Sequence, residues 1–210
     1  MKYSTFWPAR AGTPIAELTE TLAGENQYLP CLTPDFDGKA TLGGSLACNL
    51  SGYTRPWAGS LRDLVLGTRV INGKGEQLRF GGQVMKNVAG YDISRLQAGA
   101  LGTLGVITEV SLKVLPLPET AITLAYDCSA PEALDTMLRR SVEPGPLAGA
   151  CWFEGRLFLR LAGSAAAVQR AGSDWGGDMV EGDAPWAELN AFALPFFDRE
   201  GPLLRLSLPP

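Results

Sequence analysis

The sequence of 210 residues contains no histidine, and this absence limits its chemistry more than any other feature of composition. A histidine general base, a serine–histidine or cysteine–histidine nucleophile pair and a histidine-ligated metal are all excluded from the chain itself. Function classes that depend on those groups are therefore set aside.

Cysteine is scarce, and its four occurrences are scattered at Cys31, Cys48, Cys128 and Cys151, without a C-x-x-C pair. This spacing does not match an iron–sulfur or a zinc site, so we expect no metal. We expect four reduced, mostly buried thiols, as in a cytoplasmic protein.

The sequence also lacks a long apolar run and a basic region. No apolar stretch approaches the roughly 18 residues that a bilayer-spanning helix needs, and the N-terminus has no secretory pattern. A net charge of −4 and a pI near 5.0 give no support to nucleic-acid binding. With 46% hydrophobic and 19% charged residues, the chain can bury the core of one large or two small domains.

The most informative stretch is Gly43–Gly52, which reads GGSLACNLSG. Gly43 and Gly44 allow a close backbone approach, and the apolar residues after them have helical spacing. Glycines that lead into a short helix would place free N–H groups at the positive end of its dipole, which suits a diphosphate. A tight turn that opens an ordinary buried helix explains the same residues, and this run alone leaves both interpretations open.

The rest of the first half predicts one helix and a small set of strands. Thr13 is a plausible N-cap, with Pro14 as the first residue of a helix over 14–23. Strands are expected over 65–72, 77–80 and 105–115. The sequence Asn-Gly-Lys-Gly at 72–75 predicts a hairpin, because Asn-Gly accepts the positive φ of a tight turn.

The second half has a pattern of its own, and Pro116 and Pro118 place a boundary near residue 118. The order of elements is βαββαβ, which is the ferredoxin-like arrangement. The expected elements are strands over 121–126, 148–153, 156–161 and 179–181 and helices over 131–140 and 164–171. A further strand is expected over 203–208, where the chain stops.

Three groups of residues follow the glycine-rich run in a fixed order. They are Arg55-Pro56-Trp57, Lys86-Asn87 with Gly90-Tyr91-Asp92, and the sequence GALGTLGVITE over 99–109. Together these motifs resemble the FAD-binding domain of the vanillyl-alcohol oxidase superfamily, and more closely the FAD-binding subunits of bacterial glycolate oxidases. The resemblance is specific over residues 41–118 and weak in the residues that follow.

The resemblance implies an α+β protein with two domains. Residues 1–118 would form a PCMH-type FAD-binding domain, and residues 119–210 a ferredoxin-like cap or substrate domain. The family's first diphosphate-binding loop and its C-terminal closing segment have no counterpart in this sequence. Both domains are therefore expected to be partial, with the chain truncated at both ends.

The resemblance also implies which residues bind FAD. Residues 35–41 and 45–48 would border the cofactor, and residues 102–107 would hold its adenine and ribityl side, partly through main-chain atoms. The expected cofactor-binding residues are Asp35, Thr41, Gly43, Gly44, Ser45, Leu46, Ala47, Cys48, Asn49, Gly102, Thr103, Gly105, Val106 and Ile107. No catalytic residue is identified.

Two polar residues in the glycine-rich run have alternative roles. Asn49 and Ser51 can each donate toward the flavin ring, or they can bond to the local backbone, as asparagine and serine often do. Both interpretations stay open from the sequence.

The cations nearest the motifs are Arg55, Arg62 and Lys86. A 2-hydroxy acid needs a cation for its carboxylate, and arginine binds carboxylates with two hydrogen bonds. The alternative for each is a structural ion pair, and Arg62 beside Asp63 is the strongest case.

By resemblance, the protein would oxidise glycolate, or a similar 2-hydroxy acid, to the 2-oxo acid. Electrons would pass through the flavin to an iron–sulfur subunit, and a sister flavin subunit is implied as well. The complex would be cytoplasmic or peripheral at the inner face of the membrane. The alternative is a non-catalytic structural subunit that binds FAD weakly or not at all.

Overall fold

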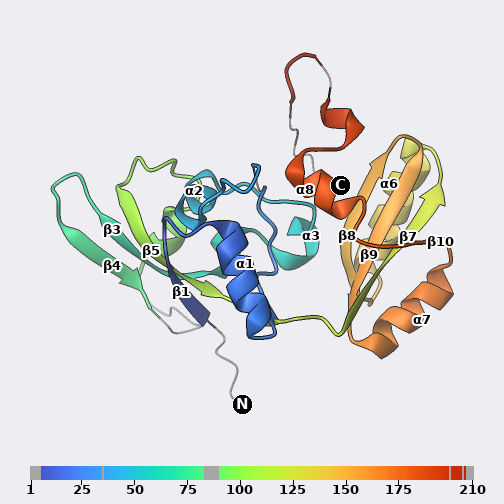
Figure 1. Ribbon diagram of the computed structural model, residues 1–210, viewed down its shortest axis with the longest axis horizontal. Coiled ribbons are helices and arrows are strands. Elements are labelled where there is room, and N and C mark those ends of the chain that lie inside the picture. The colour runs from blue at the N-terminus through green and yellow to red at the C-terminus, as the bar shows by residue number, and fades with distance from the viewer. Residues whose placement is uncertain (1–5, 35, 83–89, 199, 205, 207–210) are drawn as a thin grey trace. The chain divides into compact units, whose positions relative to one another are not determined.

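The computed structural model describes residues 6–34, 36–82, 90–198, 200–204 and 206. The chain divides into two compact units, Met1–Leu117 and Pro118–Pro210, and Figure 1 shows the elements of each. No helix in the described part of the chain is both long enough and apolar enough to cross a membrane.

Unit 1 contains a four-stranded antiparallel sheet with the strand order β1-β5-β3-β4. Its strands are β1 (Phe6–Arg10), β3 (Val65–Ile71), β4 (Gln77–Gly81) and β5 (Val106–Lys113). A separate two-stranded sheet pairs β2 (Gln27–Tyr28) with β6 (Leu115–Pro116). The strand expected over 105–115 is therefore divided between two sheets.

The hairpin between β3 and β4 is present, but its turn differs from the expected one. The side-chain oxygen of Asn72 accepts hydrogen bonds from the N–H groups of Lys74 at 2.9 Å and Glu76 at 3.0 Å. Positive φ falls on Gly75 (+78°) and not on the Asn-Gly pair. Because the Asn72 side chain bonds to residues later in the loop, the connection is longer than a two-residue turn, and its left-handed residue is Gly75.

The helices of unit 1 are α1 (Ile15–Gly24), α2 (Leu42–Cys48), α3 (Arg55–Ala58), α4 (Leu61–Leu64) and α5 (Ile93–Leu96). The sequence did not predict the last three, because a single turn is too short to show an apolar period. The expected cap of α1 is wrong: Pro14 is the N-cap, and no side chain caps this helix. The Thr13 carbonyl instead accepts the N–H of Leu42 at 2.9 Å.

The core of unit 1 lies between these helices and one face of the sheet. Fully buried leucines from α1, α2 and α4 pack with Val110 and Leu112 of β5. Side chains alternate along a strand, so Glu109 and Ser111 point to the opposite face. That second face of the sheet carries polar residues.

Unit 2 has the order β7-α6-β8-β9-α7-β10, and its antiparallel sheet has the order β10-β7-β9-β8. The expected ferredoxin-like arrangement is therefore confirmed. The elements are β7 (Thr120–Asp127), α6 (Ala130–Val142), β8 (Leu147–Phe153), β9 (Arg156–Gly163), α7 (Ala165–Trp175) and β10 (Asp178–Val180).

After β10 the chain forms two elements that the sequence did not predict, α8 (Trp186–Ala191) and a 3-10 turn, η1 (Pro195–Phe197). Trp186 is fully buried, and its indole N–H donates to the hydroxyl of Thr123 at 2.8 Å. The strand expected over 203–208 is not found: residues 203, 204 and 206 are in no strand, and the others lie outside the described residues.

Candidate cofactor site

The N-terminus of α2 does not present free N–H groups to a ligand, which corrects the expectation for the glycine-rich run. Gly43 and Gly44 lie inside the first turn, and not before it. The N–H of Gly43 donates to the Ala11 carbonyl at 2.7 Å, and the N–H of Gly44 donates to the Thr41 hydroxyl at 3.2 Å. With Leu42 bonded to Thr13, the first donors of this helix are used by the protein itself.

Gly43 has a packing reason to be glycine. A Cβ atom at this position would lie 2.6 Å from the Ala11 Cβ and 3.0 Å from the Ala11 carbonyl oxygen. The close backbone approach that the sequence predicted is therefore made to the chain that follows β1. Ser45 and Leu46 are buried beside it, and Leu46 belongs to the core.

The C-terminus of α2 joins the two predicted cofactor-binding motifs. Asn49 ends the helix in the left-handed conformation, with φ 48° and ψ 36°, which asparagine tolerates better than most residues. The N–H of Gly99 donates to the Leu46 carbonyl at 3.1 Å, and the N–H of Leu101 donates to the Ala47 carbonyl at 2.9 Å. The segments 41–49 and 102–107 are therefore neighbours in space.

The second motif reaches β5 through a tight turn. The Thr103 hydroxyl donates to the Ala100 carbonyl at 2.7 Å, and Gly102 has a φ of +75°. At Gly105, where φ is +140°, a Cβ atom would lie 2.6 Å from the Ile71 carbonyl oxygen. Glycine is therefore required there for β5 to begin beside β3. Ile107, two residues on, packs against the core.

Two buried polar atoms at the end of the glycine-rich run have no hydrogen-bond partner in the described part of the chain. They are the side-chain oxygen of Asn49 and the hydroxyl of Ser51, whose residue is only 7% exposed. The structure therefore does not show the local backbone bonding that was the alternative for these atoms. A buried polar atom without a partner costs about 1–3 kcal/mol, so both are candidates for a ligand's hydrogen bonds.

The segment before Asp35 lies against the end of the same run. The N–H of Gly52 donates to the Leu32 carbonyl at 2.7 Å, and the N–H of Leu32 donates to the Thr54 hydroxyl at 3.2 Å. The neighbouring Thr33 has a buried hydroxyl without a partner. Asp35 itself lies outside the described residues.

Apolar side chains are exposed beside this junction. Leu101 is 70% exposed and Val106 is 66% exposed, and Leu104 lies between them in the sequence. Cys48, at the last turn of α2, is also exposed. Exposed apolar groups that follow one another along a loop are typical of a surface that a ligand or a partner covers.

The cations near the motifs make no ion pair in the described part of the chain. Arg55 and Arg62 are both exposed, and the ion pair expected between Arg62 and Asp63 does not form. Asp63 instead accepts hydrogen bonds from the backbone N–H of Ser60 at 2.8 Å and from its hydroxyl at 2.9 Å. The backbone bond from Ser60 holds the pKa of Asp63 below its usual value. Lys86 lies outside the described residues.

All four cysteines are free thiols, as expected, although only Cys31 is fully buried. Burial raises the pKa of Cys31, and likewise that of Cys151, to about 12. The described residues contain no group of three or more potential ligands that could hold a metal ion.

Comparison with known proteins agrees with this arrangement. Residues 7–81 match the family model described as FAD binding domain. Two solved structures of alkyldihydroxyacetonephosphate synthase superpose on 90% of the chain with TM-scores of 0.66 and 0.68, at 20% sequence identity, and the matches cover 42% and 44% of those chains. The expected α+β fold class is confirmed. Residues 7–81 are therefore similar to an FAD-binding domain, and the expected cofactor, FAD, is confirmed by this match.

The similarity to individual relatives is more specific. The chain is 47% identical over 201 residues to glycolate oxidase subunit GlcE of Escherichia coli (strain K12), covering 96% of this chain and 57% of that protein. It is 44% identical over 85 residues to glycolate oxidase subunit GlcD of Bacillus subtilis (strain 168), and this match covers 40% of this chain and 18% of that protein. The expected resemblance to glycolate oxidase FAD-binding subunits is confirmed. The chain spans little more than half the length of the GlcE relative.

Sequence reasoning missed the residues that join the two motifs. Gly99 and Leu101 donate the hydrogen bonds to α2, but neither was predicted as part of the site. The spacing of glycines in Gly99–Gly105 was the one sequence feature that could have indicated this contact. A main-chain N–H group can donate whatever the side chain is, so residue type does not reveal it.

Proposed function

We propose that this chain is part of an FAD-binding subunit of a glycolate oxidase-type complex. Its substrate would be glycolate or a similar 2-hydroxy acid, which is oxidised to the 2-oxo acid. We assign this activity to the assembled complex and not to the chain alone, which covers 57% of its GlcE relative.

The observation that carries the proposal is the junction at the end of α2. The buried side-chain oxygens of Asn49 and Ser51 have no hydrogen-bond partner among the described residues. The preceding helix, α2, is hydrogen-bonded through its Leu46 and Ala47 carbonyls to the loop that carries the exposed Leu101 and Leu104. This combination suits a ligand with a flat apolar ring and polar edges. FAD is such a ligand, and when bound it supplies the ring that accepts two electrons from a substrate.

Within this proposal the chain's own residues bind and orient the cofactor. The Asn49 oxygen would accept from an N–H group of the ring, and the Ser51 hydroxyl would donate to a ring oxygen. Leu101, Leu104 and Val106 would keep water from the apolar surface of the cofactor. The main chain over 102–107 would hold its adenine and ribityl side.

The proposal also assigns partners. The chain has no cluster of cysteines for an iron–sulfur centre, so electrons would leave through a separate iron–sulfur subunit. A sister flavin subunit, related to GlcD, would complete the assembly. Unit 2 would be the cap or substrate domain of the subunit.

The first experiment tests FAD binding by the site. The purified chain is mixed with FAD, passed through gel filtration and examined by visible absorption. Asn49→Gly keeps the left-handed backbone but removes the amide, so we expect the unfolding midpoint to stay and retained FAD to fall at least about fivefold.

Asn26→Gly is the matched control, because Asn26 is also an asparagine with positive φ (55°) in unit 1, but it is exposed, in the turn that follows α1. It should leave FAD retention unchanged. Retention that is equal in the Asn49 and Asn26 variants would contradict the role of Asn49.

The second experiment tests the reaction in the assembled complex. The chain is co-expressed with its flavin and iron–sulfur partner subunits, and reduction of a dye is followed with glycolate, D-lactate and D-2-hydroxyglutarate. We expect glycolate to give the highest rate. A complex that holds FAD but reduces no dye with any of the three would contradict the enzymatic proposal.

A second candidate function is a structural subunit that binds FAD weakly or not at all. It is favoured by the first turn of α2, whose N–H groups are bonded to Ala11, Thr13 and Thr41 and cannot bind a diphosphate. A colourless chain that still assembles with its partners and supports their activity would favour this function.

A further inference from the structure

The polar face of the unit 1 sheet carries a row of charged residues from four strands. Arg69 of β3 is directly opposite Arg79 of β4 on one side and Glu109 of β5 on the other. Glu109 is in turn opposite Arg10 at the end of β1. Residues directly opposite one another share one face of a sheet, so all four lie on the same side.

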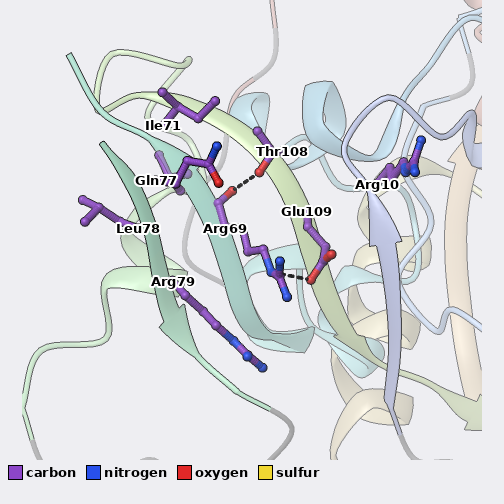
Figure 2. A pocket seen from close by; sticks show the side chains of 9 residues that line it. Arg10, Arg69, Ile71, Gln77, Leu78, Arg79, Thr108 and Glu109 are labelled. Carbon is purple, nitrogen blue, oxygen red and sulfur yellow. Dashed lines mark hydrogen bonds and ion pairs between the residues drawn. The ribbon is translucent and has the colours of Figure 1, made fainter. Parts of the chain in front are cut away.

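Figure 2 shows how the central residues of this row are arranged. Arg69 and Arg79 extend in the same direction from neighbouring strands, and Arg69 reaches Glu109, with 3.1 Å between its Nε and the carboxylate oxygen. The Arg69 side chain is 53% exposed and that of Glu109 is 35% exposed. The row is therefore accessible from solvent.

The positive charge in this row is only partly compensated. Glu109 neutralises Arg69, but in the described part of the chain the side chains of Arg10 and Arg79 make no ion pair or hydrogen bond. Like charges directly opposite on neighbouring strands destabilise a sheet. The three arginines and one glutamate of the row carry a combined charge of +2, whereas the chain as a whole has a net charge of −4. This face of the sheet is therefore positive although the chain is acidic.

The row borders a hollow of about 630 Å³, lined also by Gln77, Ile71 and Thr108. Gln77 offers an amide and Thr108 a hydroxyl, although the Thr108 hydroxyl already donates to the Arg69 carbonyl at 3.2 Å. The volume is in the range of small-ligand sites. The side chains of Arg69, Arg79 and Glu109 that line the hollow are on the face of the sheet opposite to the core residues Val110 and Leu112.

We propose that this hollow binds a small anion with at least two negative charges, held between the guanidinium groups of Arg69 and Arg79. Guanidinium groups bind phosphate and carboxylate with paired hydrogen bonds. An anion between the two arginines would compensate the charge that Glu109 leaves, and Arg10 would add attraction from the rim. Phosphate and carboxylate share this chemistry, and the test distinguishes them. The proposal does not depend on FAD or on the oxidation of a 2-hydroxy acid.

The test is a calorimetric titration of the purified chain at low ionic strength with inorganic diphosphate and, separately, with malonate. The double variant R69Q/R79Q should weaken binding of the tighter anion about tenfold or more. The matched control is R139Q/R170Q, which removes the same charge from exposed positions on α6 and α7 of unit 2. The control should bind as the unchanged chain does.

A variant with the opposite expected effect keeps the test valid if the double variant folds poorly. Glu109→Gln removes the competing carboxylate and frees Arg69, so it should tighten binding severalfold. Tighter binding of diphosphate than of malonate assigns a phosphate ligand, and the reverse assigns a carboxylate ligand. The proposal is overturned if neither anion binds, if the control loses as much affinity as R69Q/R79Q, or if Glu109→Gln weakens binding.

Discussion

The two units differ in how completely they satisfy their own buried polar groups. In unit 2 the buried Thr123 hydroxyl accepts a hydrogen bond from the indole N–H of Trp186. Among the described residues, the buried side-chain atoms without a hydrogen-bond partner belong to Thr33, Asn49, Ser51, Thr68, Ser94 and Arg95 in unit 1 and to Asn190 in unit 2.

The larger number of buried polar atoms without partners in unit 1 indicates that unit 1 is not optimised for stability alone. Each unpartnered buried atom costs about 1–3 kcal/mol, and folded proteins have only about 5–15 kcal/mol of net stability. A ligand that bonds to Asn49 and Ser51 would remove part of that cost. We therefore expect ligands to stabilise unit 1, and unit 2 to depend on its own packing.

The largest expected effect tests the packing of unit 2. Trp186→Ala removes a fully buried indole and its bond to Thr123, so it should lower the free energy of unfolding by about 3–5 kcal/mol. Chemical denaturation followed by circular dichroism measures this. Trp152→Ala is the control, since Trp152 is 37% exposed, and it should cost clearly less. Equal losses of unfolding free energy in the two variants would contradict the argument that the complete burial of Trp186 makes it the more important residue for stability.

The next effect tests the turn that leads into β5 of unit 1. Gly105→Ala forces a side chain into a φ of +140° and within 2.6 Å of the Ile71 carbonyl oxygen. We expect a loss of about 2 kcal/mol or more. Gly73→Ala, where a Cβ atom meets nothing within 4 Å, should change stability by less than about 0.5 kcal/mol. The same denaturation measurement compares the two, and equal effects would contradict the steric argument.

A matched pair of hydroxyl deletions compares the two units directly. Ser51→Ala removes a buried hydroxyl that has no partner among the described residues, so the free chain should keep its stability or gain up to about 1 kcal/mol. Thr123→Val leaves the Trp186 N–H without its acceptor and should lose about 1–3 kcal/mol. Thermal unfolding without FAD measures both. A clear loss of stability in Ser51→Ala would mean that this hydroxyl has a partner.

The smallest effect concerns pH. The pKa of Asp63 is lowered in the folded chain, mainly by the N–H of Ser60, so the carboxylate stabilises the fold above the pKa of an unfolded aspartate, about 4. That stabilisation is lost as pH falls through the lower, folded pKa. Unfolding midpoints between about pH 2 and 6 should therefore fall less steeply in Asp63→Asn. Identical pH profiles for the variant and the unchanged chain would contradict this role.

How far the sequence predicted the fold follows from element length. Long elements such as β7 and α6 repeat their apolar pattern several times, so the six elements from β7 to β10 were each predicted, whereas the short α8 and η1 after them were not. The single-turn helices α3, α4 and α5 contain too few residues for a period, and they were missed.

The sequence by itself determined the fold class, the ferredoxin-like order of unit 2 and the cofactor class, and it located the two motifs that we propose bind FAD. These depend on periodicity and on residue types, which the chain carries locally. Only the tertiary structure decided that the N–H groups of Gly43 and Gly44 are already bonded, and that Arg69 is paired with Arg79 across two strands. It also decided that the buried side-chain oxygens of Asn49 and Ser51 have no hydrogen-bond partner among the described residues. Hydrogen-bond satisfaction and cross-strand register depend on partners far away in the chain, because folding brings them together and local sequence does not specify them.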